Sequence, residues 1–190
     1  MNKKKIFGIA IAEIVYFLLF ILGSSSGLIH PGVYAYIGAL LPLGFAFCYL
    51  YTAANMQHFG AAAVLNGVLL IIAILLGEGN WALIAGLVVL TVLAEVIRAL
   101  FGYNTLRGVL LSFIPFAFSF FAYTAHWWTQ TDESLGEALE MFNEAYESSM
   151  RAVIENTPVL LVVLLITIPV AIAGMRLAEK TMKKQTALLL

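Results

Sequence analysis

Residues 158–177 read PVLLVVLLITIPVAIAGMRL, an apolar run in which Arg176 is the single charged residue. An α-helix rises about 1.5 Å per residue, so about 20 apolar residues cross the roughly 30 Å of hydrocarbon in a bilayer. We therefore expect residues 158–177 to form a membrane-spanning helix.

Five further stretches have a similar composition, and the first and third of the six in chain order are the shortest, with 17 residues each. The five stretches are residues 6–22, 33–54, 60–76, 81–101 and 106–125. The whole chain of 190 residues is 62% hydrophobic and 11% charged, with a mean hydropathy of +0.97. Such a composition leaves too few polar residues to cover a water-soluble core. The sequence predicts an all-α membrane protein with six transmembrane helices in a single domain, residues 1–190.

Basic residues predict the orientation, because Lys and Arg concentrate in short cytoplasmic loops. With six spans, nine of the ten basic residues fall on one side: Lys3, Lys4, Lys5, Arg98, Arg107, Arg176, Lys180, Lys183 and Lys184. Arg151 falls on the other side, in a segment with seven acidic residues. We predict that both termini are cytoplasmic. The net charge of -1 argues against a nucleic-acid partner.

The longest connection, residues 127–157, is predicted to be an extracellular loop that contains an amphipathic helix. From Ser134 onward its apolar residues recur every three or four positions, which is typical of one helix face. They are Leu135, Ala138, Leu139, Phe142, Tyr146, Met150, Val153 and Ile154. Two interpretations stand: an interfacial helix on the outer leaflet, or a lid over a binding site.

Several kinds of chemistry have no motif in this sequence. There is no Walker A motif, so the chain does not hydrolyse ATP by that route. The histidines His30, His58 and His126 are scattered and Cys48 is the single cysteine, so neither a metal site nor a cofactor is predicted. Residues 23–27, GSSSG, match the G-x-S-x-G pattern with Ser25 as nucleophile, but that pattern works at a strand–turn–helix elbow. We expect no enzyme, and an intramembrane serine hydrolase is kept as an alternative.

Charged residues inside predicted spans must face protein, because lipid solvates them poorly. Glu95 and Arg98 lie three residues apart on one helix face and can neutralise each other. Glu13 is predicted either to pair with Arg98 or Arg107 or to carry a proton. A stand-alone proton-coupled transporter or channel that uses Glu13 and Glu95 is therefore one hypothesis for the function.

Small residues in the first span predict close helix packing. Gly8 and Ala12 are four residues apart, with Ala10 between them, and this spacing lets another helix approach. That helix belongs either to this chain or to a partner.

The outer connections hold aromatic and polar residues that suit a small-molecule site. The candidates are His30, Tyr34, Glu78, Asn80, Trp81, Tyr123, His126, Trp127 and Trp128. The alternative for the tryptophans is the aromatic belt at the membrane surface.

The sequence has a basic N-terminus before six spans, a Gly77-Glu78-Gly79-Asn80-Trp81 turn, Ala94-Glu95 in the fourth span and Gly174-Met175-Arg176-Leu177 near the C-terminus. In these features it resembles the Trep_Strep family of bacterial membrane proteins. That family is similar to the substrate-binding S components of energy-coupling factor (ECF) transporters. The resemblance implies a multi-pass protein of the bacterial cytoplasmic membrane that captures a micronutrient from outside. A transmembrane T subunit and two ATPase subunits would drive its release inside, and docking on the T subunit would use Gly8, Ala10 and Ala12.

The resemblance leaves the substrate open. Nickel and cobalt S components carry an N-terminal Met-x-His arrangement, and Met1-Asn2-Lys3 lacks the histidine. The aromatic residues suit a flat ring such as a vitamin, while His, Tyr and Met near the outer face suit haem or an iron chelate. We expect a small-molecule substrate of one of these kinds.

Overall fold

The computed structural model of the protein describes residues 3–190, which contain helices and short connections and no strand. Met1 and Asn2, part of the N-terminal arrangement considered above, lie outside the described residues. In chain order the helices are α1 (Lys3–Ser25), η1 (Ser26–Leu28), α2 (Pro31–Tyr36), η2 (Ile37–Ala39), α3 (Pro42–Asn55), α4 (Ala61–Leu75), α5 (Trp81–Phe101), α6 (Leu106–Phe116), α7 (Ser119–Thr124), α8 (His126–Thr129), α9 (Thr131–Met141), α10 (Glu144–Glu155), α11 (Thr157–Thr181) and α12 (Lys183–Thr186). The predicted all-α fold is confirmed.

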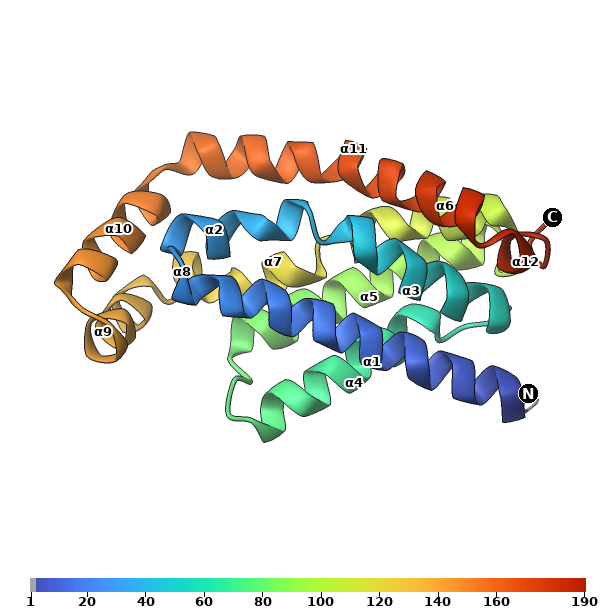
Figure 1. Ribbon diagram of the computed structural model, residues 1–190, viewed down its shortest axis with the longest axis horizontal. Coiled ribbons are helices and arrows are strands. Elements are labelled where there is room, and N and C mark those ends of the chain that lie inside the picture. Colours follow the sequence, from blue (N-terminus) through green and yellow to red (C-terminus); the bar gives the residue numbers. More distant parts are fainter. Residues whose placement is uncertain (1–2) are drawn as a thin grey trace.

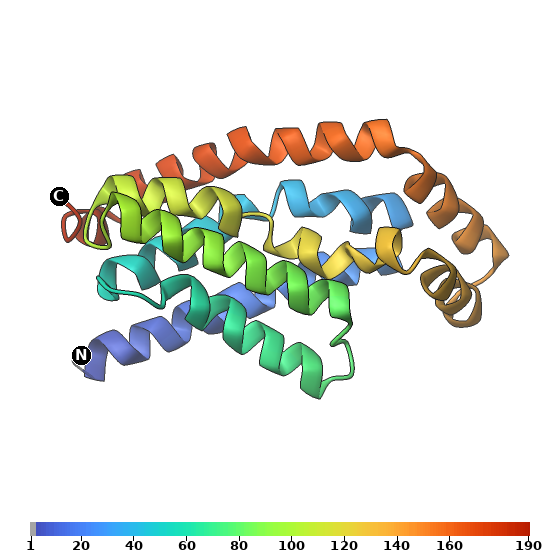
Figure 2. The same ribbon diagram turned by 180° about the vertical axis from the view of Figure 1, so that it is seen from behind.

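The helices form an elongated bundle in which α1, α2 with α3, α4, α5, α6 with α7, and α11 run lengthwise (Figure 1). The start of α1 and the end of α12 lie at one end of the bundle. The helices α9 and α10 extend beyond the other end, as the view from behind also shows (Figure 2). We call these the terminal end and the hairpin end.

Four described helical segments are long and apolar enough to cross a membrane: α1 with η1, α5, α6 with α7, and α11. The pair formed by Pro31–Ala39 and Pro42–Asn55, bent by 42°, makes a fifth if it is taken as one span. The predicted span 60–76 corresponds to α4, which has 15 residues. At about 1.5 Å per residue α4 reaches only about 22 Å, less than the roughly 30 Å of a hydrocarbon core. By length and composition the structure therefore supports four or five spans.

Prolines account for the two interrupted segments. Proline lacks the N–H of an ordinary residue, and its ring clashes with the preceding turn of a helix. Pro42 begins α3 after the bend, and Pro115 lies in the last turn of α6, which ends at Phe116. Pro169, in contrast, lies within the uninterrupted helix α11.

The centre of the bundle is packed with aromatic rings and a few polar bridges. The Tyr16 hydroxyl donates to Asn66 Oδ1 (2.8 Å), and Asn66 Nδ2 donates to Thr91 Oγ1 (3.0 Å), which links α1, α4 and α5. The Tyr49 hydroxyl donates to Ser112 Oγ (2.8 Å) and links α3 to α6. Because buried polar groups lose stability when left unpaired, these bonds favour one arrangement of the helices.

The outward faces of α5 and α11 carry large apolar side chains. Val92 and Leu100 on α5 are 55% and 75% exposed, and Leu165 on α11 is 67% exposed. Such faces suit lipid rather than water, because contiguous apolar patches of this kind are rare on soluble proteins.

The predicted pair of Glu95 and Arg98 is present and almost fully buried, with 3.9 Å between Glu95 Oε2 and Arg98 Nη1. Glu95 Oε1 also accepts a hydrogen bond from the backbone N–H of Ala62 (2.7 Å) in the first turn of α4. Arg98 Nη2 donates to the carbonyl oxygens of Met56 (2.9 Å), Tyr103 (3.1 Å) and Ala53 (3.3 Å). The pair thus satisfies backbone groups at the end of α3 and the start of α4, where a helix has unpaired N–H and C=O groups.

Gly174 allows α11 to lie directly against the start of α3. A Cβ atom at this position would stand 2.7 Å from the Pro42 carbonyl oxygen and 3.0 Å from Leu43 Cα. Both are backbone atoms, so the two helices would have to separate.

Replacing Gly174 with Ala should lower the free energy of unfolding by about 1–3 kcal/mol, the usual cost of overpacking. Equilibrium unfolding in mild detergent measures this loss. Gly67→Ala is the matched control, because a Cβ atom there meets no atom within 4 Å. The free energy of unfolding of that control should rise by about 0.5–1 kcal/mol, because Ala favours a helix more than Gly does. Equal stability of the two variants would contradict close packing at Gly174.

Candidate functional site

A cavity of about 410 Å³ lies at the hairpin end. It is surrounded by the ends of α1, α2 and α7, by the turn after α4, and by α8, α9 and α10. Its lining residues are Ser24, Ser25, Gly27, Leu28, Tyr34, Glu78, Tyr123, His126, Trp127, Ser134, Glu137, Ala138, Met141, Phe142, Tyr146 and Met150. The size is within the range of small-molecule pockets, about 300–1,000 Å³.

The floor of the cavity is aromatic. The ring centroids of Tyr34 and Trp127 are 4.8 Å apart, and those of Tyr34 and Tyr123 are 6.3 Å apart. Tyr34 and Trp127 are 8% and 5% exposed, so neighbouring helices hold both rings in place. A flat apolar group can stack on such a surface without displacing it.

The roof consists of α9 and α10, which form a helical hairpin. The segment predicted to contain an amphipathic helix contains two helices, because α9 ends at Met141 and α10 begins at Glu144. Asn143 makes the break: its backbone is extended and its Oδ1 accepts a hydrogen bond from the N–H of Tyr146 (3.0 Å). This side-chain cap starts a new helix, so α10 turns back along α9.

Three hydrogen bonds hold α10 on the bundle. The Tyr146 hydroxyl donates to the Gly27 carbonyl (2.9 Å), Trp128 Nε1 donates to the Ile154 carbonyl (3.2 Å), and the Tyr36 hydroxyl donates to the Val153 carbonyl (3.4 Å). Partial burial raises the pKa of the Tyr146 phenol above its usual value, which keeps it a donor. A roof held by three bonds, with most of its residues exposed, favours the lid interpretation over the interfacial helix.

Replacing Tyr146 with Phe should weaken closure of α10 by about 1 kcal/mol, the net value of one hydrogen bond. Amide hydrogen exchange across residues 144–155 should then be about fivefold faster. Ser149→Ala is the control, since the Ser149 hydroxyl bonds within α10 itself, to Ala145. Indistinguishable exchange in the two variants would show that the Tyr146 bond does not hold the roof.

Glu78 is the carboxylate at the edge of the cavity. It lies in the short turn after α4, and its Oε2 accepts a hydrogen bond from the Tyr123 hydroxyl (3.3 Å). Glu78 also lines a polar cavity of about 300 Å³ together with Gly77, Gly79, Asn80, His126, Gln130, Glu133, Ser134 and Glu137. The two cavities therefore share Glu78, His126, Ser134 and Glu137.

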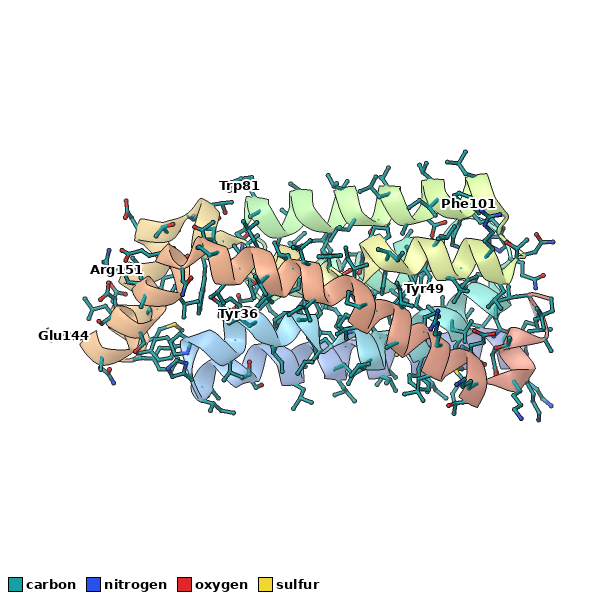
Figure 3. The ribbon with its side chains drawn as sticks, turned by 90° about the horizontal axis from the view of Figure 1, so that it is seen from above. Tyr36, Tyr49, Trp81, Phe101, Glu144 and Arg151 are labelled. Carbon is teal, nitrogen blue, oxygen red and sulfur yellow. The ribbon has the colours of Figure 1, made fainter. Side chains whose placement is uncertain are left out.

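The structure brings together five of the nine predicted binding residues: Tyr34, Glu78, Tyr123, His126 and Trp127. Asn80 lines the polar cavity and also caps α5, where its Oδ1 accepts from the N–H of Leu83 (2.9 Å). Trp81 is 58% exposed and points away from the bundle at the hairpin end of α5 (Figure 3). Trp128 holds α10, and His30 caps α2 through its Nδ1, which accepts from the N–H of Gly32 (3.0 Å).

Sequence reasoning missed the roof residues Ser134, Glu137 and Met141 as part of the site. One signal was available: Asn143 precedes Glu144, and Asn before an acidic residue is typical of the start of a new helix. A second helix in the loop would have indicated a hairpin that returns to the bundle.

The other predicted residues lie away from this cavity. Glu13 pairs with neither Arg98 nor Arg107, and its carboxylate oxygens are buried with no hydrogen-bond partner in the described chain. Gly8 faces Tyr51 of α3, Ala12 is buried at 7% exposure, and Ala10 is exposed. Gly8 and Ala12 also line an apolar groove of about 260 Å³ with Tyr51, so their predicted role in docking stays a prediction.

Ser25 does line the cavity, but its surroundings differ from those of a nucleophile elbow. Residues 23–27 form the end of α1 and part of η1, and no strand precedes them in the described chain. The serine-hydrolase alternative stays a prediction, which labelling with a serine-reactive probe tests.

Residues 3–187 match the family described as hypothetical bacterial integral membrane protein (Trep_Strep). The chain belongs to this family. The resemblance drawn from the turn at residues 77–81 and the C-terminal pattern is thereby confirmed at the level of the family. Neither the curated proteins nor the solved structures gave a match to this Trep_Strep protein.

Proposed function

We propose that this Trep_Strep protein is the substrate-binding S component of an ECF importer in the bacterial cytoplasmic membrane. It binds a small micronutrient without transforming it, and a T subunit and two ATPase subunits drive its release inside. The observation that supports this proposal is the cavity of about 410 Å³ at the hairpin end, roofed by α9 and α10. A binding protein needs such a pocket, and the chain has no Walker A motif of its own.

The proposal includes six spans with both termini in the cytoplasm. Nine of ten basic residues lie in segments assigned to the cytoplasmic side. α4 starts beside the Glu95–Arg98 pair and is followed by the turn with Glu78 at the cavity, so it runs along the bundle toward the hairpin end. A helix of this length can span where the bilayer thins locally.

Co-purification tests the proposal. The full-length protein, expressed with the neighbouring transporter subunits and extracted in mild detergent, should recover a T subunit and two ATPases. Native mass spectrometry of the purified protein should show an added small-molecule mass. Repeated recovery of the protein without any of these subunits would refute the assignment.

Ala10→Trp should reduce recovery of the T subunit more than tenfold and leave the bound ligand and the unfolding midpoint unchanged. Ala10 is exposed on α1, so a bulky side chain there blocks a partner rather than the fold. The same change at buried Ala12 would disturb packing as well. Leu165→Trp, on the exposed face of α11, is the control. Full recovery of partners with Ala10→Trp would exclude this face as the docking surface.

A stand-alone proton-coupled transporter is the second candidate, and the unpartnered buried carboxylate of Glu13 favours it. Glu95 suits this role less well, because it binds Arg98 and Ala62. Uptake into proteoliposomes that lack ATPase subunits, abolished by Glu13→Gln, would support this candidate.

A further inference from the structure

The side chains that line the cavity carry negative charge and no permanent positive charge. Glu78 and Glu137 line the cavity, and Glu133 joins them in the polar cavity beside it. Within residues 3–190, no Lys or Arg lines either space. Arg151 instead pairs with Glu147, with 3.1 Å between Nε and Oε1. An anionic ligand would therefore meet like charge with no compensating base.

Glu78 stands where a ligand in any of three spaces would contact it. Besides the two cavities already described, it lines a narrow apolar pocket of about 100 Å³ formed with Phe20, Leu69 and Leu83. The Tyr123 hydroxyl, 3.3 Å from Glu78 Oε2, orients the carboxylate from the cavity side. A ligand that fills the cavity thus places part of itself beside this carboxylate.

The remaining polar and aromatic groups of the site also favour positive charge. The faces of Tyr34 and Trp127 at the floor attract cations through the ring quadrupole. His126 Nδ1 lies 2.8 Å from the Tyr123 carbonyl oxygen, and because a carbonyl only accepts, Nδ1 carries the proton. In the neutral form of the ring, Nε2 is then a further acceptor for an N–H group.

The charge around the cavity acts in the same direction. Residues 24–36, 77–81 and 123–157 together contain eight acidic residues and one basic residue, Arg151. A surface of one sign raises the local concentration of ligands of the opposite sign.

We propose that the ligand of this cavity is an organic cation with a flat apolar body, its ring on the aromatic floor and its charged nitrogen beside Glu78. This inference rests on the proposed function, since it assigns the substrate class of the same binding site. It disfavours haem and other ligands that carry carboxylates.

Isothermal titration calorimetry of the purified full-length protein with three indole compounds tests the charge. Tryptamine is a cation, tryptophol is neutral and indole-3-acetate is an anion, and all three share one ring. Tryptamine should bind at least about tenfold more tightly than tryptophol, and indole-3-acetate should not bind measurably. Glu78→Gln should lower the affinity for tryptamine about tenfold and leave that for tryptophol unchanged. Glu140→Gln, an exposed carboxylate on α9 outside the cavities, should have no effect.

Three results would each overturn the cation assignment. They are no saturable binding of tryptamine, binding of indole-3-acetate or haemin that is tighter than that of tryptamine, or a Glu78→Gln variant that still prefers tryptamine over tryptophol to the same degree. The proposed function is judged separately by co-purification. Recovery of the T subunit and ATPases together with haemin binding would overturn the cation assignment and support the assignment as an S component. Failure to recover those partners would refute the assignment as an S component, whatever the titrations show.

Discussion

Replacing Arg98 with Met is expected to lower the free energy of unfolding by about 3–5 kcal/mol, because it leaves a buried charge without its partner. Glu95 is 2% exposed, so its carboxylate would lose its cationic partner without gaining access to water. Three carbonyl groups, at the end of α3 and after α5, would also lose their donor. Equilibrium unfolding in mild detergent measures the change.

Arg107→Met provides the matched control at the same end of the bundle. Arg107 is exposed, and its contact is with the ring of Phe101, 5.0 Å from guanidinium carbon to ring centroid. Loss of this contact should lower the free energy of unfolding by less than about 1 kcal/mol. Equal losses for Arg98→Met and Arg107→Met would show that the buried pair does not hold α3, α4 and α5 together.

The double variant Glu95→Gln with Arg98→Met separates charge from hydrogen bonding. It leaves no unpaired charge, and the amide oxygen of Gln can still accept from the N–H of Ala62. We therefore expect it to be more stable than Arg98→Met alone. A double variant that is no more stable than the single one would assign the loss to the freed carbonyl groups instead.

Periodicity and spacing predicted much of the fold, because they depend on neighbours along the chain. The predicted span 81–101 coincides with α5, and the three-residue spacing of Glu95 and Arg98 predicted their contact. The carbonyl partners of Arg98 were beyond this reasoning, since they depend on where the end of α3 lies in space. The same limit explains Glu13, whose predicted arginine partners lie on helices that do not bring them to it.

The site was predictable where it is built from residues next to the apolar runs. Tyr34, Glu78 and Trp127 were found because aromatic and polar residues stood out beside apolar runs. The roof was not found, because the apolar spacing of residues 135–154 continues through the break at Asn143. A helical period shows which residues share a face but not that the chain reverses, and only the reversal brings Glu137 and Tyr146 over one cavity.

The three tryptophans give a direct test of the site, since the sequence could not tell belt residues from binding residues. Trp127 is 5% exposed at the cavity floor, whereas Trp81 is 58% exposed on the outer surface of α5. Trp127→Ala should lower the free energy of unfolding by about 3–5 kcal/mol, as for other buried tryptophans. The fraction of protein that carries a bound ligand in native mass spectra should fall more than tenfold.

Trp81→Ala should change neither quantity, because nothing in the cavity depends on that ring. Trp127→Phe separates binding from folding. The Phe ring can still stack on the ligand and contact the Tyr34 ring, but it buries less surface than Trp. We expect it to recover most of the stability and some of the ligand occupancy. Equal occupancy in Trp127→Ala and Trp81→Ala would place the binding site elsewhere, whereas loss only with Trp81→Ala would move it to the membrane face of α5.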